Sequence, residues 1–516
     1  MEQESRMDPF LKIKKFEELL QITQSLREQG KRIVHCHGVF DLMHPGHIRH
    51  LRAAKGEGDV LVVTVTRDEH VNKGPGRPVF TLALRLETLA SLEFVDYVAA
   101  NEWPDAVETI KGIKPHVFAK GNEFRNLDDV TGAVAREYSA AEEVGARMHF
   151  TDDMGFEDVR STSLLNTHFN VFSDETREFL AQFRQRYKDS DVIEKLDGLK
   201  NLRGLVIGDT IVDEYHYCKP LGKSLKENMV AMRYLNSERF AGGVLACANH
   251  LANFVGQVRM VSCLGVQDSK TDFIVSKLKH NVEPKFFYRP DAPTTVKSRF
   301  IEHPYLSKIF EAYYFEDSPL PADMEDDLYA YLDRVLPEYD FVMVTDYGHG
   351  FLSERVIELI ASKAKFLAVN AQTNAGNYGY NLITKYPRAD FICIDEPELR
   401  LSMQDRTSPI EVLIQKLSEK LSVSKVIITR GHIGSTAYSS DGHYYHTPVF
   451  SSRIVDRMGA GDAYFAVATP CAALGLPMDL LGFIGNAAGA FAIGIVGNRD
   501  SIEAIPLFRF IKTLLK

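Results

Sequence analysis

The sequence has few cysteines and no long apolar run. Its six cysteines in 516 residues are scattered and never form Cys-x-x-Cys, so we expect free, buried thiols in a reducing compartment. No uninterrupted apolar stretch reaches the roughly 18 residues of a membrane-spanning helix. The start, MEQESRMDPFLKIKKF, contains acidic residues and lacks the apolar core of a signal peptide. We therefore expect a cytoplasmic protein without a membrane partner.

Positive charge is not in excess either. Lysine and arginine total 60 against 70 aspartates and glutamates, for a net charge of −10 at pH 7. This balance argues against nucleic acid as the main partner, so a phosphate-binding site would have to be a local cluster of donors. Hydrophobic residues make up 45% and charged residues 25%, which is typical of a globular protein, and the length predicts two domains.

The chain divides at a charged segment with helical spacing, DETREFLAQFRQRYKDSD. We expect one domain over residues 1–170, a connecting helical linker over 171–200 and a second domain over 201–516. In both halves, apolar strands such as VLVVTVT and FVMVTD alternate with helical segments. This alternation predicts two α/β domains, each with a parallel sheet.

Two histidines flank a Pro-Gly pair in the first half, in HGVFDLMHPGH. A β-type run, RIVHCHGVF, comes before them, and a segment with helical spacing follows. His44 and His47 therefore lie where a strand gives way to a helix, a junction that favours a bound anion such as phosphate. A single histidine there would more often be a helix cap or a surface residue. Metal ligation is a weaker alternative, because no other His or Cys cluster is nearby.

Basic and hydroxyl side chains follow in two segments. TRDEHVNKGPGRPVF contains Lys73 and Arg77, and Arg85 comes on the next predicted helix. Together they suit the charge of a triphosphate, although each alone could be a solvated surface residue. DVRSTSLLNTHF forms either an N-cap cluster or a second phosphate-binding segment. Its candidate residues are Arg160, Ser161, Thr162 and Ser163.

Residues from about 30 to 166 resemble the HxGH cytidylyltransferase-like nucleotidyltransferases, which have a Rossmann-like fold. The resemblance rests on GVFDLMHPGH, KGPGRPVFTLALRLETLASLEFVDYV and STS, and the first two stretches are most similar to the adenylyltransferase half of the bacterial heptose phosphate kinase/adenylyltransferases. It implies that His44 and His47 stabilise the α-phosphate, that Lys73 neutralises charge, and that a sugar phosphate attacks with Mg²⁺ on the triphosphate. The nucleotide-binding residues that it implies are Gly38, Phe40, Arg77, Arg85, Arg160, Ser161, Thr162 and Ser163.

A second candidate site lies near the C-terminus, in DRMGAGDAYFAVA. A Gly-Ala-Gly turn before an apolar helix can bind an anion, and the carboxylate of Asp462 at its end can take a proton from an alcohol. A GAGD segment alone could be a helix cap. Four further segments accompany it, GDTIVDEYHY, RFAGGVLACANHLA, VTDYGHGFL and ITRGHIGSTAYS, and GNAAGAFAIGIVGN follows it.

In that order, these segments resemble the ribokinase-like sugar kinases from Leu202 to Lys516. The resemblance implies a ribokinase-like α/β domain in which Asp462 is the general base. It also implies that Asp213, Gly242 and Gly243 face the sugar. The nucleotide and phosphoryl-binding residues that it implies are Thr429, Gly431, Gly434, Gly459, Ala460, Gly461 and Asn486.

Two departures from the kinase pattern affect these expectations. Ala246 stands where the family usually has an asparagine, so Asn249 is the candidate substrate-binding residue instead. The family's Asn-x-x-Glu is DEPE here, and we expect Asp395 and Glu398 to hold Mg²⁺ through water. The domain order is also expected to be reversed relative to the heptose enzymes.

The sequence thus predicts a bifunctional enzyme of nucleotide-sugar synthesis, expected as a homodimer. It would phosphorylate a sugar or sugar phosphate with ATP. It would also transfer a nucleotidyl group to a sugar phosphate with release of pyrophosphate, and we expect AMP in preference to CMP. One alternative is a cytidylyltransferase that uses CTP and has a divergent kinase half. Another is an inactive regulator that binds sugar or nucleotide.

Overall fold

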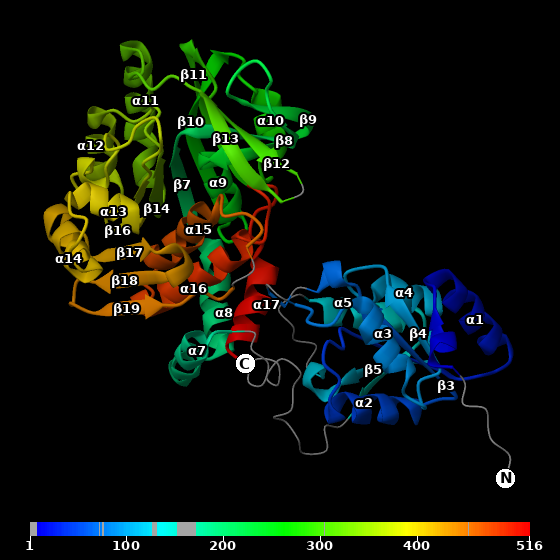
Figure 1. Ribbon diagram of the computed structural model, residues 1–516. Coiled ribbons are helices and arrows are strands. Elements are labelled where there is room, and N and C mark those ends of the chain that lie inside the picture. The colour runs from blue at the N-terminus through cyan, green and yellow to red at the C-terminus, as the bar shows by residue number, and fades with distance from the viewer. Residues whose placement is uncertain are drawn as a thin grey trace. The chain divides into compact units, whose positions relative to one another are not determined.

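The computed structural model forms two compact units (Figure 1). The first comprises Met1–Arg184 with Phe508–Lys516, and the second comprises Gln185–Leu507. Each is built on a largely parallel sheet with helices, so the predicted α/β class is confirmed. The structure describes residues 8–71, 73–74, 77–125, 132–151, 172–303, 305–451 and 454–516.

The first unit contains a six-stranded parallel sheet in the order β1-β4-β3-β2-β5-β6. Its strands are β1 (Ile13–Lys14), β2 (Ile33–Gly38), β3 (Val60–Thr66), β4 (Tyr97–Asn101), β5 (Val117–Gly121) and β6 (Arg147–Thr151). The helices around it are α1 (Phe16–Glu28), α2 (Pro45–Lys55), α3 (Leu82–Ala90), α4 (Val107–Ile113) and α5 (Ala133–Glu143).

Both faces of this sheet are buried, which explains its continuous apolar strands. All seven residues of β3 are buried. Val63 packs in one cluster with Leu51 of α2, whereas Val62 packs in another with Leu19 of α1. A parallel strand that is covered on both faces has an unbroken apolar sequence. The segment VLVVTVT begins and ends at the same residues as β3.

At β2, the side of the sheet on which the chain adds its next strands changes. From β2 it passes to β3 on one side, and later to β5 on the other. In open α/β sheets, ligands bind outside the carboxyl ends of the strands at such a switch point. Gly38 ends β2, and His44 caps α2 six residues later, so the two histidines lie at this position.

The charged segment predicted as a connecting helix is two helices, α7 (Asp174–Arg186) and α8 (Asp189–Asp197). Leu180 and Phe183 of α7 are buried, as the helical spacing of its apolar residues requires. The boundaries proposed at residues 170 and 200 remain predictions.

The second unit has a nine-stranded sheet in the order β11-β10-β7-β14-β15-β16-β17-β18-β19, parallel up to β17 and antiparallel beyond it. A separate four-stranded sheet, β13-β12-β8-β9, was not predicted. The strands are β7 (Arg203–Gly208), β8 (Thr210–Lys223), β9 (Val230–Gly243), β10 (Gln257–Gln267), β11 (Val282–Pro293), β12 (Val296–Glu302), β13 (Ser307–Tyr314), β14 (Phe341–Asp346), β15 (Leu367–Ala371), β16 (Phe391–Asp395), β17 (Lys425–Thr429), β18 (Ser435–Ser439) and β19 (Tyr444–Thr447).

Helices cover both faces of the nine-stranded sheet (Figure 1). The helices of this unit include α9 (Val244–Ala252), α10 (Thr271–Lys277), α11 (Ala322–Val335), α12 (Glu354–Lys363), α13 (Glu396–Met403), α14 (Ile410–Leu421), α15 (Ala460–Ala473) and α16 (Met478–Ala492). The last helix, α17 (Ala504–Leu514), runs into the segment Phe508–Lys516 that belongs to the first unit. The helices α11 to α14 share one apolar cluster with β7, β14, β15, β16 and β17. The almost entirely buried helices α9 and α15 contact β7, β14 and β16.

Two sequence expectations about composition can be compared with the fold. All six cysteines lie within the described residues and are free, as expected, and five of them are buried. Among the described helices, none combines the length and the apolar character needed to span a bilayer.

Candidate active sites

His44 and His47 lie together at the start of α2. Pro45 occupies the first turn, and the Nδ1 atom of His44 accepts a hydrogen bond from the Gly46 amide at 3.2 Å. The two imidazole rings are 3.9 Å apart between centroids. Phe40 meets the ring of His47 edge-on at 5.4 Å and contacts the end of β2 at Gly38. The paired imidazoles predicted from HPGH are therefore present beside a helix N-terminus, which attracts anions.

Burial keeps these histidines neutral. Burial is the main cause that lowers the pKa of His47 to about 3, and the neighbouring His44 and Lys73 add to it. Burial and then Lys73 lower the pKa of His44. Each neutral imidazole can donate one N–H to an anion. The cation of the site is Lys73, whose own pKa burial lowers to about 8, with the Asp41 carboxylate opposing that effect.

Arg77 lies beside Asp41 in the loop before α3. Its guanidinium is 3.6 Å from the Asp41 carboxylate, and both side chains are buried. The other oxygen of Asp41 accepts the amides of Val79 and Phe80 at 2.8 and 3.0 Å. Asp41 therefore joins the loop after β2 to the basic loop, and it is a site residue that the sequence reasoning missed.

Arg85, expected to contact the nucleotide, donates its hydrogen bonds to groups of the protein. Its side chain is fully buried and donates to the carbonyl oxygens of Val39 and Phe80 at 2.6 and 3.0 Å, and to the carboxylate of Asp68. With its donors used inside the protein, Arg85 fixes the loops that carry the site. The other predicted phosphate contacts, Arg160, Ser161, Thr162 and Ser163, lie outside the described residues.

A row of buried polar side chains behind the histidine pair was not predicted. The Thr64 hydroxyl is 2.8 Å from His35 Nε2 and 3.0 Å from His37 Nδ1, and His50 Nδ1 is 2.7 Å from the Thr151 hydroxyl. Burial lowers the pKa of His37 to about 3 and that of His50 to about 4. These neutral side chains join β2, β3, α2 and β6 by hydrogen bonds that apolar patterning does not reveal.

In the second unit, Asp462 lies in the first turn of α15 and contacts Tyr347. Gly459 caps the helix with φ +78°, and a Cβ there would lie 2.1 Å from the Asn498 side-chain oxygen. A Cβ on Gly461 would meet open space, so the turn faces room for a ligand. The Tyr347 hydroxyl donates to Asp462 Oδ1 at 2.7 Å. Burial raises the pKa of Asp462 to about 6, which suits a general base near neutral pH.

The predicted sugar-facing residues lie close together on the four-stranded sheet. Asp213 of β8 forms a buried ion pair with Arg299 of β12. A Cβ on Gly242 would lie 2.2 Å from Asp213 Oδ2, so only glycine lets this carboxylate lie against β9. Gly243 follows with φ +57° and begins α9. Asp213 also contributes to raising the pKa of Asp462, which relates the predicted sugar-facing carboxylate to the predicted base.

Lys297 is a further residue of this site that sequence reasoning missed. Burial is the largest cause that lowers its pKa, and Asp213 opposes it. Its ammonium lies over the rings of Tyr313 and Tyr347 at 5.1 and 5.9 Å, with no carboxylate of the described residues at ion-pair distance. Lys297 and Arg299 alternate along β12 and so share a face of the strand. That alternation, in VKSRF, was the available signal.

Asn249, expected to contact the sugar in place of the missing asparagine, forms two hydrogen bonds to the backbone. Its Nδ2 donates to the Lys277 carbonyl at 2.9 Å, and its Oδ1 accepts the Lys279 amide at 2.9 Å. Both ends of the amide thus join α9 to the segment between α10 and β11. Asn249 and Ala246 also line a cavity of about 970 Å³, so the expected sugar contact of Asn249 stays a prediction.

The predicted nucleotide-binding residues meet where β17 turns into β18. Thr429 ends β17, and Gly431 and Gly434 take positive φ values of 56° and 107° in the turn. A Cβ on Gly434 would lie 2.0 Å from the Thr447 carbonyl oxygen. Asn486 of α16 is buried and donates to Ser435 at 2.6 Å, directly after Gly434.

Asp395 and Glu398 begin α13 with a capping box. The Asp395 carboxylate accepts the Glu398 amide at 2.8 Å, and the Glu398 carboxylate accepts the Asp395 amide at 2.9 Å. Burial, with the charge of Asp395, raises the pKa of Glu398 to about 8. Within the part of the chain that the structure describes, no group of three His, Cys, Asp or Glu could hold a metal ion. Two carboxylates with remaining lone pairs fit a hydrated Mg²⁺ better than a directly coordinated ion.

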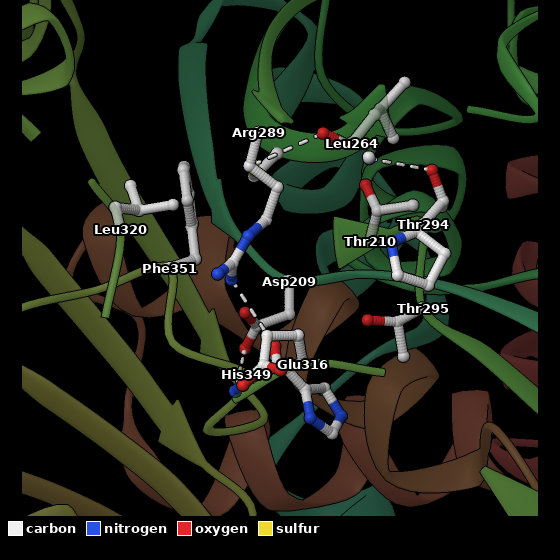
Figure 2. A pocket seen from close by; sticks show the side chains of 13 residues that line it. Asp209, Thr210, Leu264, Arg289, Thr294, Thr295, Glu316, Leu320, His349 and Phe351 are labelled. Carbon is white, nitrogen blue, oxygen red and sulfur yellow. Dashed lines mark hydrogen bonds between the residues drawn. The ribbon is translucent and has the colours of Figure 1, made fainter. Parts of the chain in front are cut away.

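A small cavity lies beside the turn that carries Tyr347 (Figure 2). Its volume of about 20 Å³ suffices for one water molecule. Asp209 and His349 line it, and both ring nitrogens of His349 are buried without a hydrogen-bond partner in the described structure. Burial, with the nearby Asp346, raises the pKa of Asp209 to about 7.

Two family models match the chain. The model described as pfkB family carbohydrate kinase matches residues 204–505, and the cytidylyltransferase-like model matches residues 35–167. The nucleotidyltransferase-like region therefore precedes the kinase region in this chain. These matches do not support the expected reversal of this order relative to the heptose enzymes.

The curated relatives match only part of the chain. The bifunctional protein HldE of Nitratiruptor sp. is 42% identical over 127 residues, which are 24% of this chain and 28% of that protein. The protein of the same name from Desulfatibacillum aliphaticivorans is 36% identical over 156 residues, or 30% of each chain. The chain thus spans less than a third of the length of these relatives.

Among solved structures, phosphofructokinase-2 from Escherichia coli, in complex with substrates and products, is similar to this chain with a TM-score of 0.51. It is 14% identical in sequence, and the match covers 61% of this chain and 100% of that one. At this identity the likeness concerns the fold alone. The fold of the second unit and the family model over residues 204–505, more than half of the sequence, lead to one conclusion: the chain belongs to the pfkB family of carbohydrate kinases.

Proposed function

We propose that the protein is a bifunctional enzyme of nucleotide-sugar synthesis. Its second unit phosphorylates a sugar or sugar phosphate with ATP, and its first unit transfers a nucleotidyl group to a sugar phosphate with release of pyrophosphate. The observation that supports this most is the pairing of two different sites in one chain. One presents two closely spaced neutral imidazoles at a helix start, and the other presents a buried carboxylate beside a Gly-Ala-Gly turn.

In the kinase reaction, Asp462 takes the proton of the acceptor hydroxyl as its oxygen attacks the γ-phosphorus of ATP and ADP leaves. The amides at Gly459 to Gly461 face the transferring phosphoryl group at the N-terminus of α15, where the helix dipole stabilises negative charge. Asp213 accepts hydrogen bonds from the sugar hydroxyls, and Lys297 supplies positive charge near them. Thr429, Gly431, Gly434 and Asn486 line the nucleotide.

In the nucleotidyl transfer, a phosphate oxygen of the sugar phosphate attacks the α-phosphorus of the nucleotide, and pyrophosphate leaves. The attacking group is already an anion, so the protein needs no general base. His44 and His47 donate hydrogen bonds to the developing charge on the α-phosphate, and Lys73 neutralises it. Arg77 and the hydroxyl groups of Ser161, Thr162 and Ser163 hold the outer phosphates.

A Mg²⁺ ion bound with the triphosphate would offset its negative charge in both reactions. In the second unit, Asp395 and Glu398 would hold this ion through water. The arrangement that supports this is the close pair of carboxylates at the start of α13.

Assaying pyrophosphate release with ATP and with CTP over a set of sugar phosphates tests the transfer. ATP is the expected donor, and activity with CTP alone would replace our proposal with the cytidylyltransferase alternative, which the cytidylyltransferase-like family match favours. The kinase is tested by sugar-dependent ADP formation. Sugar or nucleotide binding in calorimetry without turnover would favour the regulator.

We also propose a homodimer in a reducing, cytoplasmic setting. Exposed apolar side chains gather on the four-stranded sheet and its β8–β9 turn, where a second copy could cover them. They are Leu221, Leu225, Met229, Val230, Tyr234, Leu235, Ile309, Phe310 and Tyr314. Light scattering should give twice the chain mass, and Phe310→Glu should return the protein to a monomer.

A further inference from the structure

Tyr347 follows β14 and contacts the proposed base. We propose that Tyr347 is a positioning residue that orients the Asp462 carboxylate toward the acceptor hydroxyl by donating its phenolic hydrogen to Oδ1. This inference rests on the proposed kinase function. The hydroxyl of Tyr347 is 2.7 Å from Asp462 Oδ1, and the tyrosine side chain is buried. With Oδ1 held by the phenol, Oδ2 is the oxygen that accepts the substrate proton.

The backbone around Tyr347 is anchored on both sides. Its amide donates to Asp209 Oδ2 at 2.8 Å, and its carbonyl accepts the side-chain amides of Asn374 and Asn377 at 2.9 and 2.8 Å. Gly348 comes next with φ +71°, and a Cβ there would lie 2.2 Å from the Asn377 amide nitrogen. The turn therefore cannot shift easily, and the phenol is presented to Asp462 from a fixed position. Figure 2 shows Asp209 and His349 on the cavity beside this turn.

These anchors explain three polar residues, two of them buried, that the phosphoryl transfer itself does not use. Asp209 does not reach the substrate in the proposed reaction, but its carboxylate accepts the amides of Tyr347 and, at 3.5 Å, His349. Asn374 and Asn377 lie in the segment after β15, far along the chain, and both end on the same carbonyl oxygen. Their shared target is the backbone of the residue that contacts the base.

The charged groups around Asp462 determine the sign of the expected effect. Asp213 raises the pKa of Asp462, whereas the Tyr347 hydrogen bond and the Lys297 ammonium lower it. Glu398 is also within electrostatic range, and the Cys247 thiol lies 3.9 Å from the Asp462 carbonyl oxygen. Removing the phenolic hydroxyl removes one of the two interactions that lower the pKa of Asp462, while burial and Asp213 still raise it. The pKa of Asp462 should then rise above its value of about 6.

The test is Tyr347→Phe, with kinase kcat and KM measured from pH 5 to 9. We expect the acid limb of the kcat profile to move upward by about one pH unit, since a hydrogen bond to a charged group has about that effect. At pH 7, kcat should fall roughly tenfold while the KM for ATP changes less than twofold. Tyr187→Phe is the matched control, because it removes a bond of 2.8 Å to the Asp479 carboxylate, outside the proposed site. An unmoved acid limb in Tyr347→Phe would overturn the inference.

A second measurement does not depend on catalysis. Thermal unfolding at pH 8, where Asp462 is ionised, is compared for Tyr347→Phe, Asp462→Ala, which removes the hydrogen-bond acceptor, and the double variant. We expect clearly non-additive shifts of the unfolding midpoint, because the two side chains share one hydrogen bond. Additive shifts would overturn the inference even if the kinase is active. Non-additive shifts without any sugar-dependent ADP formation would instead overturn the proposed kinase function and leave the contact intact.

Discussion

The two sites differ in how burial acts on their ionisable groups. At the start of α2, burial lowers the pKa of His47 to about 3, so the imidazole is a neutral hydrogen-bond donor. At the start of α15, burial raises the pKa of Asp462 to about 6, so the carboxylate holds a proton more readily. The same desolvation disfavours the charged form in both cases. It yields a neutral hydrogen-bond donor in one unit and, in the other, a carboxylate suited to the proton transfer that we propose.

This difference follows the chemistry proposed for each unit. An attacking phosphate needs no base, because it is already ionised, whereas an attacking hydroxyl must lose a proton. The first site accordingly combines neutral donors with the Lys73 cation, and the second has a carboxylate held by a phenol. Substitutions at the two helix starts should therefore act on separate reactions and in different ways.

The largest expected effect is that of Asp462→Asn on the kinase. The amide keeps the shape of the side chain but cannot take the proton, so kcat should fall by about 10² to 10⁴. ATP affinity and nucleotidyl transfer should be unchanged. Full kinase activity in this variant would remove the proposed contrast between the two sites.

His47→Asn should lower nucleotidyl transfer by about 10² to 10³, the usual effect of removing one donor to transition-state charge. Kinase turnover measured on the same preparation serves as the control for folding. Pyrophosphate release close to that of the unmodified protein would show that the paired imidazoles do not act on the α-phosphate.

The kinase and the nucleotidyl transfer should lose activity at opposite ends of the pH range. Below about pH 6, kinase kcat/KM should fall tenfold per pH unit, as Asp462 becomes protonated. Nucleotidyl transfer should fall above about pH 8 instead, as Lys73 loses its proton, with little change between pH 5 and 7 because His47 is already neutral. Matching acid limbs in the two profiles would contradict this comparison.

The smallest effect is expected for Asn249→Ala. The substitution removes two hydrogen bonds to the backbone near β11, so it should lower the free energy of unfolding by about 1 to 2 kcal/mol. The KM for the sugar acceptor should change less than twofold. A tenfold rise in that KM at unchanged stability would restore Asn249 as a substrate contact.

Sequence patterns predicted the elements of the fold well where a strand is buried on both faces. VLVVTVT and FVMVTD correspond to β3 and β14 without a change of limits. The four-stranded sheet was missed because its long strands carry many exposed polar residues, as in β9 and β13. A strand with that composition gives neither an apolar run nor a clear alternation.

Some residues of the candidate sites could likewise be predicted from local sequence patterns, and others could not. His44, His47 and Asp462 were predictable because each lies within a few residues of a Gly- or Pro-containing turn and a helix start. Tyr347 and Lys297 were not assigned a role, since each reaches its site from another strand or loop. Asp41 precedes His44 in the same loop, but its role depends on contacts with Arg77, Val79 and Phe80 of the next loop. Arg85 and Asn249 had suitable side chains, and in the structure both form hydrogen bonds within the protein.

Sequence patterns thus predicted the α/β class, the two helix starts that we propose to bind anions, and the residues that the local turns carry there. Those features depend on neighbours in the chain, through helix capping, glycine conformations and strand periodicity. Only the tertiary structure decided which distant side chains complete each site and what protonation state burial imposes. Desolvation and pairwise contacts depend on packing between segments far apart in sequence, such as β14 against α15, and no local pattern encodes them.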